Sequence, residues 1–292
     1  MQLHRRHFLN LAAALPLAAQ GRVTRNPGTR TRLALNAYSF NEPLRSGAMT
    51  LPDVLDYCAQ HNIDAFDATG YYFPNYPAVP SDDYIYSLKR KAFVNGITIC
   101  GTGVRNDFAV ADPAKRQADL TLVKNWILVA RKLGANTIRV FSGLKIPEGQ
   151  SFDDVLKWMV PLFQECAEYA RRHGVVVALQ NHNDFLKTAD ETIRVLTAVN
   201  SDCFGLMLDI GSLRQSDPYA EIEKLLPYAV SWQLKENLWV NGKEVPTDLR
   251  RIKAIIEKGG YRGLLPIETL GAGDPKIKVA RFFSEARSIF GS

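Results

Sequence analysis

From residue 33 onward, short runs of apolar residues alternate with longer segments in which the apolar residues recur at helical spacing. The runs predict eight β-strands, at residues 33–38, 63–68, 97–103, 137–142, 175–180, 204–209, 230–235 and 263–268. Most of these runs are apolar almost throughout, which is typical of strands that are covered on both faces of a parallel sheet. The segments between them predict helices, so strand and helix alternate along the chain.

The joints between helix and strand support this alternation. A Gly or Asn that ends each helix stands directly before the next strand at Asn62, Gly96, Gly134, Gly174 and Gly260. Eight strand–helix units over residues 33–292 match the size of a single-domain (β/α)8 TIM barrel. The competing fold, an open doubly wound sheet, would need a glycine-rich turn after its first strand, where this chain has "NAYSFNEP".

Residues 1–32 differ from the rest of the chain. Arg5 and Arg6 precede an apolar stretch that ends in small residues, so residues 1–21 predict a Tat-like signal peptide and residues 22–32 a linker. The protein is then exported to the periplasm. The alternative is an apolar surface helix.

Charge narrows the choice of partners. The chain has a net charge of +6, and six of its 36 basic residues lie in residues 1–32, which contain no acid. Removing them leaves 36 − 6 = 30 basic against 30 acidic residues, so residues 33–292 are neutral. A neutral domain argues against nucleic acid as a partner. No run of about 20 apolar residues is present, so no membrane span is expected after cleavage of the signal.

Polar side chains gather where the predicted strands end, which is where TIM barrels carry their working residues. The fifth strand runs into "QNHND", the sixth ends at Asp209 and the eighth at Glu268. A buried carboxylate is costly unless it is paired or bound to a metal. Two carboxylates with nearby amide oxygens suit Mn²⁺ or Mg²⁺, whereas the alternative is a structural salt bridge to Lys235 or Arg139.

The segments "VALQNHND", "GLMLDIGS", "WQLKEN" and "LPIETLG" resemble the xylose isomerase-like TIM-barrel family of sugar isomerases and epimerases. That superfamily also includes metal-dependent apurinic endonucleases. The resemblance implies one divalent metal, which epimerising members hold with Glu, Asp, His and Glu at the ends of strands five to eight. The matching positions in this chain are Gln180, Asp209, Gln233 and Glu268.

The two glutamines change the chemistry that the resemblance implies. Gln180 cannot accept a proton at neutral pH, so epimerisation by two opposed bases is not expected. We expect proton transfer next to the carbonyl of a sugar or keto-sugar, with Glu268 as base and a metal or Lys235 polarising the carbonyl. His182 is a second candidate acid or base, and its alternative is an ordinary hydrogen-bonding histidine.

Other residues near the strand ends are candidates for binding the carbohydrate. The segment Gly70–Tyr86 holds six aromatic residues and should lie over the barrel mouth, where it would stack on a sugar ring. Alternatively, this loop packs on the barrel or on a second subunit, so a homo-oligomer is compatible with it. The residues expected to bind substrate are Tyr38, Asp67, Tyr71, Tyr72, Phe73, Arg105 and Ser142.

Three classes of protein therefore compete. The first is a sugar isomerase or epimerase, with a keto-sugar or keto-glycoside lyase as its variant. The second is a carbohydrate-binding barrel without catalysis, suggested by Gln180 and Gln233. The third, an apurinic endonuclease, is opposed by the export signal and by the neutral charge of the barrel.

Overall fold

A computed structural model of the chain describes residues 21–291. The signal peptide predicted at residues 1–21 therefore lies outside the described residues, apart from Gly21. The last three residues of the predicted linker belong to the first strand, which begins at Arg30. Upstream of that strand, the backbone amide of Val23 donates to the carbonyl of Pro227 at 2.9 Å.

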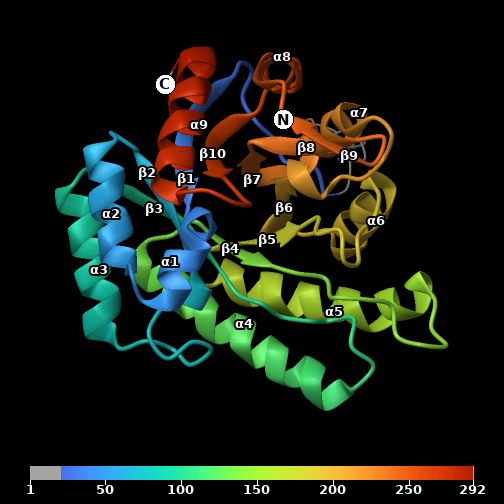
Figure 1. The fold of residues 1–292 in the computed structure, drawn as a ribbon. Coiled ribbons are helices and arrows are strands. Elements are labelled where there is room, and N and C mark those ends of the chain that lie inside the picture. The colour runs from blue at the N-terminus through green and yellow to red at the C-terminus, as the bar shows by residue number, and fades with distance from the viewer. Residues whose placement is uncertain (1–20, 292) are drawn as a thin grey trace, which may run out of the picture.

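Eight parallel strands close into a barrel in the order β1-β10-β7-β6-β5-β4-β3-β2 (Figure 1). They are β1 Arg30–Asn36, β2 Ala65–Thr69, β3 Thr98–Gly103, β4 Thr137–Val140, β5 Val176–Gln180, β6 Phe204–Asp209, β7 Ala229–Lys235 and β10 Arg262–Glu268. The (β/α)8 barrel predicted from the sequence is confirmed, and each predicted strand overlaps one of these eight.

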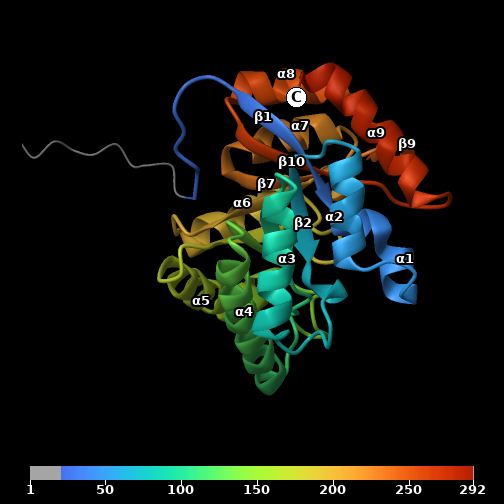
Figure 2. The same cartoon turned by 90° about the vertical axis from the view of Figure 1, so that its left-hand side faces the viewer.

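Helices surround the strands on the outside of the barrel (Figures 1 and 2). They are α1 Asn41–Ser46, α2 Leu51–Gln60, α3 Asp82–Val94, α4 Pro113–Leu133, α5 Phe152–Arg171, α6 Ala189–Val199, α7 Pro218–Leu225, α8 Leu249–Gly259 and α9 Pro275–Phe290. Capping boxes start three of them, at Thr50, Ser151 and Thr188. Gly134 and Gly260 end α4 and α8 in the left-handed conformation, as their places in the sequence predict. Among residues 21–291, no helix has the length and apolar character needed to cross a membrane.

The register of the strands brings the predicted site residues to one level. Gln180, Asp209, Lys235 and Glu268 are the last residues of β5, β6, β7 and β10. Strand β7 lies between β6 and β10, with Gln233 beside Asp209 and Lys235 beside Glu268. Four chain segments far apart in sequence therefore end at the same mouth.

A two-stranded hairpin follows β7 directly and was not predicted. It consists of β8 Asn237–Val240 and β9 Lys243–Pro246, which pair antiparallel. Asn241 and Gly242 form its turn with φ values of 50° and 76°. An Asn-Gly pair that follows an apolar run, here "NLWV", is a hairpin signal, so the sequence contained the information that locates this element.

Candidate active site

A cavity of about 560 Å³ opens at the carboxyl ends of the barrel strands. The five strand-end residues Gln180, Asp209, Gln233, Lys235 and Glu268 all line it. Each is buried, with no more than 7% of its surface exposed, so these polar groups must satisfy one another or a bound molecule.

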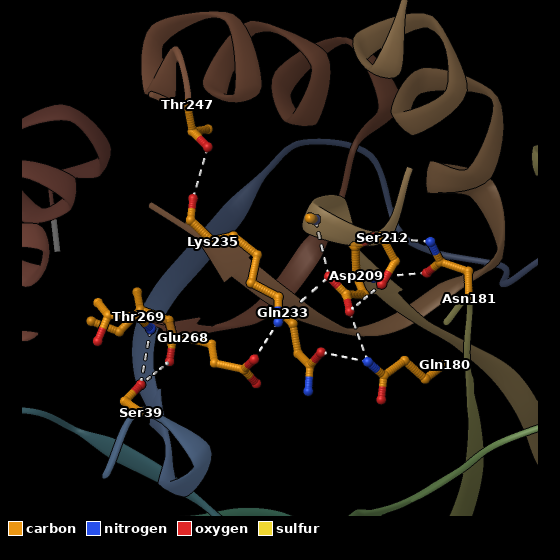
Figure 3. Close-up of polar contacts among 12 residues, drawn as sticks. Ser39, Gln180, Asn181, Asp209, Ser212, Gln233, Lys235, Thr247, Glu268 and Thr269 are labelled. Atoms are coloured by element: carbon orange, nitrogen blue, oxygen red, sulfur yellow. Dashed lines mark hydrogen bonds and ion pairs between the residues drawn. The ribbon is translucent and has the colours of Figure 1, made fainter. Parts of the chain in front are cut away.

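Asp209 is the centre of this network (Figure 3). Its Oδ2 accepts hydrogen bonds from Gln180 Nε2 at 2.7 Å and from Ser212 Oγ at 2.8 Å. Its Oδ1 accepts from the backbone amide of Gly211 at 3.0 Å. The side chain of Asn181 bonds both the amide and the carbonyl of Asp209, at 2.8 and 2.9 Å. Both the backbone and the carboxylate of Asp209 are therefore fixed by hydrogen bonds.

The carboxylate of Asp209 dictates how the two glutamines are oriented. A carboxylate only accepts hydrogen bonds, so Gln180 must present its amide nitrogen to Asp209. The same nitrogen donates to Gln233 Oε1 at 2.8 Å, which turns the oxygen of Gln233 inward. The second atom of each amide, the Gln180 oxygen and the Gln233 nitrogen, points away from Asp209 (Figure 3).

Lys235 lies between the two carboxylates. Its ammonium donates a hydrogen bond to Glu268 Oε1 and lies 3.7 Å from Asp209 Oδ1. Burial alone would lower the pKa of Lys235, but the charges of Asp209 and Glu268 outweigh burial and raise it. Burial raises the pKa of Glu268, and Lys235 opposes that rise. Lys235 is therefore a cation at neutral pH, and its charge stabilises both carboxylates.

The predicted metal site does not match this arrangement. Within residues 21–291, no group of three or more His, Cys, Asp or Glu side chains is placed to hold a metal ion. Gln180 presents a nitrogen and not an oxygen to Asp209, and the ammonium of Lys235 stands between Asp209 and Glu268. The four residues predicted to bind Mn²⁺ or Mg²⁺ are brought together, but their donor atoms do not fit a divalent ion.

His182 lines the cavity just beyond the end of β5. Its Nδ1 lies 3.0 Å from Asp184 Oδ2, although the angles are not those of a hydrogen bond, so Asp184 acts on it through charge. Its ring packs edge-to-face on Phe141. Burial lowers the pKa of His182 below its ordinary value, which leaves the imidazole neutral at pH 7.

Arg139 occupies the other side of the barrel mouth and was not among the predicted site residues. It is 5% exposed, lines the cavity and donates to the hydroxyl of Tyr71 and to the carbonyl of Val104. Its guanidinium lies 4.3 Å from the ring centre of Phe141. A charged residue inside the apolar strand "TIRV" is the signal that could have identified it.

The predicted substrate-binding residues divide into two groups. Tyr38, Tyr71 and Arg105 line the cavity, as expected. Asp67 does not line it and lies buried inside the barrel, where a Cβ on Gly101 would approach its carboxylate to 3.1 Å. Burial raises the pKa of Asp67 to about 6, against the opposing charge of Arg139.

Tyr72, Phe73 and Ser142 also lie outside the cavity lining, contrary to expectation. The Tyr72 hydroxyl donates to Asn41 Oδ1 at 2.8 Å, and Phe73 is buried against Trp126. Ser142 is 1% exposed. Much of the aromatic loop therefore packs on the barrel, which is the alternative that its composition left open.

The unpredicted hairpin contributes Trp239 and Glu244 to the cavity lining. The guanidinium of Arg214, which follows β6, stacks 3.9 Å from the ring centre of Trp239. Strand-end reasoning missed these residues because they lie beyond the last residues of the barrel strands, Trp239 and Glu244 on the hairpin and Arg214 after β6. The Asn-Gly turn would have placed Trp239 near the mouth.

The sequence comparison now decides the family. A family model described as "Xylose isomerase-like TIM barrel" matches residues 55–285. The chain belongs to the xylose isomerase-like TIM barrel family. This confirms the resemblance that the strand-end motifs carried. No curated protein matches the chain in sequence.

Solved structures share the fold at low sequence identity. D-psicose 3-epimerase from Clostridium cellulolyticum H10, with D-tagatose, has a TM-score of 0.71 at 17% identity and covers 89% of this chain and 99% of its own. The 3-keto-D-glucoside 4-epimerase from E. coli has a TM-score of 0.72 at 12% identity, covering 89% and 100%. A xylose isomerase-like protein from Mycobacterium smegmatis, in complex with magnesium, has a TM-score of 0.67 at 18% identity, covering 89% and 96%.

Proposed function

We propose that this member of the family catalyses proton transfer next to the carbonyl of a sugar or keto-sugar, with Glu268 as the single base. One observation carries the proposal: Glu268 lines the cavity as a buried carboxylate beside a cation, while the glutamine Gln180 ends β5. A side-chain amide is too weakly basic to accept a proton from a substrate at neutral pH. The arrangement thus supports isomerisation by one base better than epimerisation by two.

The chemistry follows from the groups around the cavity. The carboxylate of Glu268 removes the proton from the carbon beside the carbonyl. The electron pair of that C–H bond forms a carbon–carbon double bond, and the π electrons of the carbonyl move onto its oxygen. Positive charge placed where the oxyanion develops lowers the barrier. Lys235 supplies that charge, and the Gln233 amide nitrogen, which points away from Asp209, is a second donor. The hydroxyl on the deprotonated carbon passes its proton to the oxyanion, and Glu268 returns its own proton to the former carbonyl carbon, so that the carbonyl has moved by one carbon.

The substrate class rests on the family and on the cavity. Two of the structural neighbours are named as epimerases of a ketose and of a keto-glucoside, which supports a carbohydrate. Tyr38 and Tyr71 line the cavity and offer faces for a sugar ring. The predicted export signal favours sugars without a phosphate, since those are the sugars available outside the cytoplasm.

β-Elimination from a keto-sugar is the second candidate. It begins with the same proton abstraction by Glu268 and ends with loss of a leaving group from the next carbon. The departing oxygen takes the bonding electron pair and needs a proton. His182 in the cavity lining favours this candidate, because its neutral imidazole can take a proton from the protonated Glu268 and pass it to that oxygen. The products separate the two reactions, since elimination releases the leaving group and isomerisation does not.

Hydrogen exchange tests the proposal. The purified protein is incubated with ketoses and keto-glycosides in D₂O, and deuterium at the carbon beside the carbonyl is followed by NMR. We expect exchange in the wild type and a loss of about 10²- to 10⁴-fold in Glu268→Gln, as for removal of a general base. Glu223→Gln, at a surface ion pair with Lys258, is the matched control. Exchange that persists in Glu268→Gln would overturn the assignment of the base.

A further inference from the structure

The geometry points to Lys235 as a built-in cation that occupies the place of the divalent metal, so that this active site works without one. This inference rests on the proposed location of the active site. It concerns what holds the two carboxylates together, and it is therefore testable without any substrate.

Charge gives the first reason. Asp209 and Glu268 supply two negative charges, and the ammonium of Lys235 already lies between them. A divalent ion bound by the same two carboxylates would stand next to that ammonium in a buried site, where like charges repel strongly. The lysine and the metal therefore compete for one place.

The amides give the second reason. Mn²⁺ and Mg²⁺ take oxygen ligands, but Gln180 turns its nitrogen toward Asp209, with a contact of 2.7 Å. Turning the amide over would bring two acceptor oxygens together at that distance. It would also break the hydrogen bond from Gln180 to Gln233. The orientation of the two glutamines therefore fits an Asp209 carboxylate whose charge is balanced by Lys235, and it does not fit one that binds a metal.

The backbone around Lys235 is built to hold this side chain. Its carbonyl accepts a hydrogen bond from the Thr247 hydroxyl at 2.8 Å. Its aliphatic stem lies on Gly211, where an added Cβ would be 2.8 Å from Lys235 Cγ. Gly211 donates its amide to Asp209, so the segment "DIGS" fixes the carboxylate and leaves room for the lysine beside it.

Manganese binding tests the inference on the full-length protein. Calorimetry and thermal unfolding are measured with MnCl₂ at millimolar concentration for the wild type and for the triple variant Gln180→Glu/Gln233→His/Lys235→Ala. We expect no heat of binding and no shift in melting temperature for the wild type. The triple variant, which removes the lysine and restores the usual ligand types, should gain saturable binding and a rise in melting temperature. Lys258→Ala, at the surface, should behave like the wild type.

Saturable Mn²⁺ binding by the wild type that is lost in Asp209→Asn would overturn the inference. If the triple variant does not fold, the wild-type titration decides alone, together with hydrogen exchange before and after dialysis against EDTA. Exchange that survives EDTA supports the lysine as the cation, and exchange that EDTA abolishes and Mn²⁺ restores contradicts it. Absence of exchange with every sugar would instead count against the proposed function, while the titration would still decide the metal question.

Discussion

Two buried cations stand on different sides of the barrel mouth, and they are held in different ways. Lys235, at the end of β7, lies between the carboxylates of Glu268 and Asp209. Arg139, on β4, donates to a carbonyl and a phenol and packs against aromatic rings. Within residues 21–291, no carboxylate lies within ion-pair distance of Arg139. Lys235 is thus held by ion pairs, whereas Arg139 is held by hydrogen bonds to uncharged acceptors and by packing against aromatic rings.

The difference has a chemical meaning. An ammonium is a compact charge that suits a place between two carboxylates, whereas a guanidinium is planar and stacks on rings. The charge of Lys235 is largely balanced within the protein, whereas that of Arg139 is not balanced by direct contact. Asp67 is the carboxyl group on which Arg139 acts, but the charge of Arg139 does not offset the burial of this group. The pKa of Asp67 is therefore raised to about 6.

The largest expected effect is on the lysine side. Lys235→Met leaves Asp209 and Glu268 buried without their cation, so we expect a loss of about 3 to 5 kcal/mol in the free energy of unfolding, as for breaking a buried ion pair. Urea denaturation at pH 7 measures it. Lys258→Met, at an exposed pair, should cost no more than about 1 kcal/mol. A loss in Lys235→Met as small as in this control would show that the buried carboxylates do not depend on the lysine.

The next effect is the pH dependence that Asp67 imposes. Its folded pKa of about 6 lies above the ordinary value of about 3.9, so the folded state binds more protons between these values. Its contribution to stability is present below pH 4 and is lost as the pH rises through 6. Relative to that of the wild type, the free energy of unfolding of Asp67→Asn should therefore rise by about 2 to 3 kcal/mol between pH 4 and pH 8. If the variant and the wild type differ by the same unfolding free energy at pH 4 and at pH 8, then the charge of Arg139 cancels the effect of burial on the pKa of Asp67.

Removing the arginine should cost less than removing the lysine. Arg139→Met loses the hydrogen bonds to Tyr71 and Val104 but keeps an apolar side chain against Phe141, so we expect a loss of about 2 kcal/mol. Urea denaturation at pH 7, beside the Lys235→Met variant, gives the comparison. A loss equal to that of Lys235→Met would erase the contrast between the two cations.

The smallest effect separates hydrogen bonding from stacking around Arg139. Tyr71→Phe removes the hydroxyl that accepts from Arg139 but keeps the ring 5.0 Å from the guanidinium. We expect a loss of about 1 kcal/mol in unfolding free energy, the usual worth of one hydrogen bond. Tyr86→Phe, on the exposed face of α3, is the control. A loss as large as in Arg139→Met would show that the hydroxyl, and not the rings, holds the arginine.

Local patterns in the sequence were sufficient for the barrel. Apolar runs, capping boxes and glycines at helix ends depend on neighbours within a few residues, so they can be read without knowing the rest of the chain. The rule that strand ends carry the site then placed Gln180, Asp209, Gln233, Lys235 and Glu268 together, and the structure brings all five to one cavity. The Asn-Gly hairpin was equally local and was overlooked.

The tertiary structure decided how those residues face one another. Whether Gln180 offers nitrogen or oxygen depends on a carboxylate from another strand, and the place of Lys235 between two carboxylates depends on the register of β7 between β6 and β10. The side to which Phe73 and Ser142 point was likewise set by packing against other elements. The residue types at the mouth are a property of the sequence, but their charges and hydrogen bonds belong to contacts between distant strands, which only the closed barrel forms.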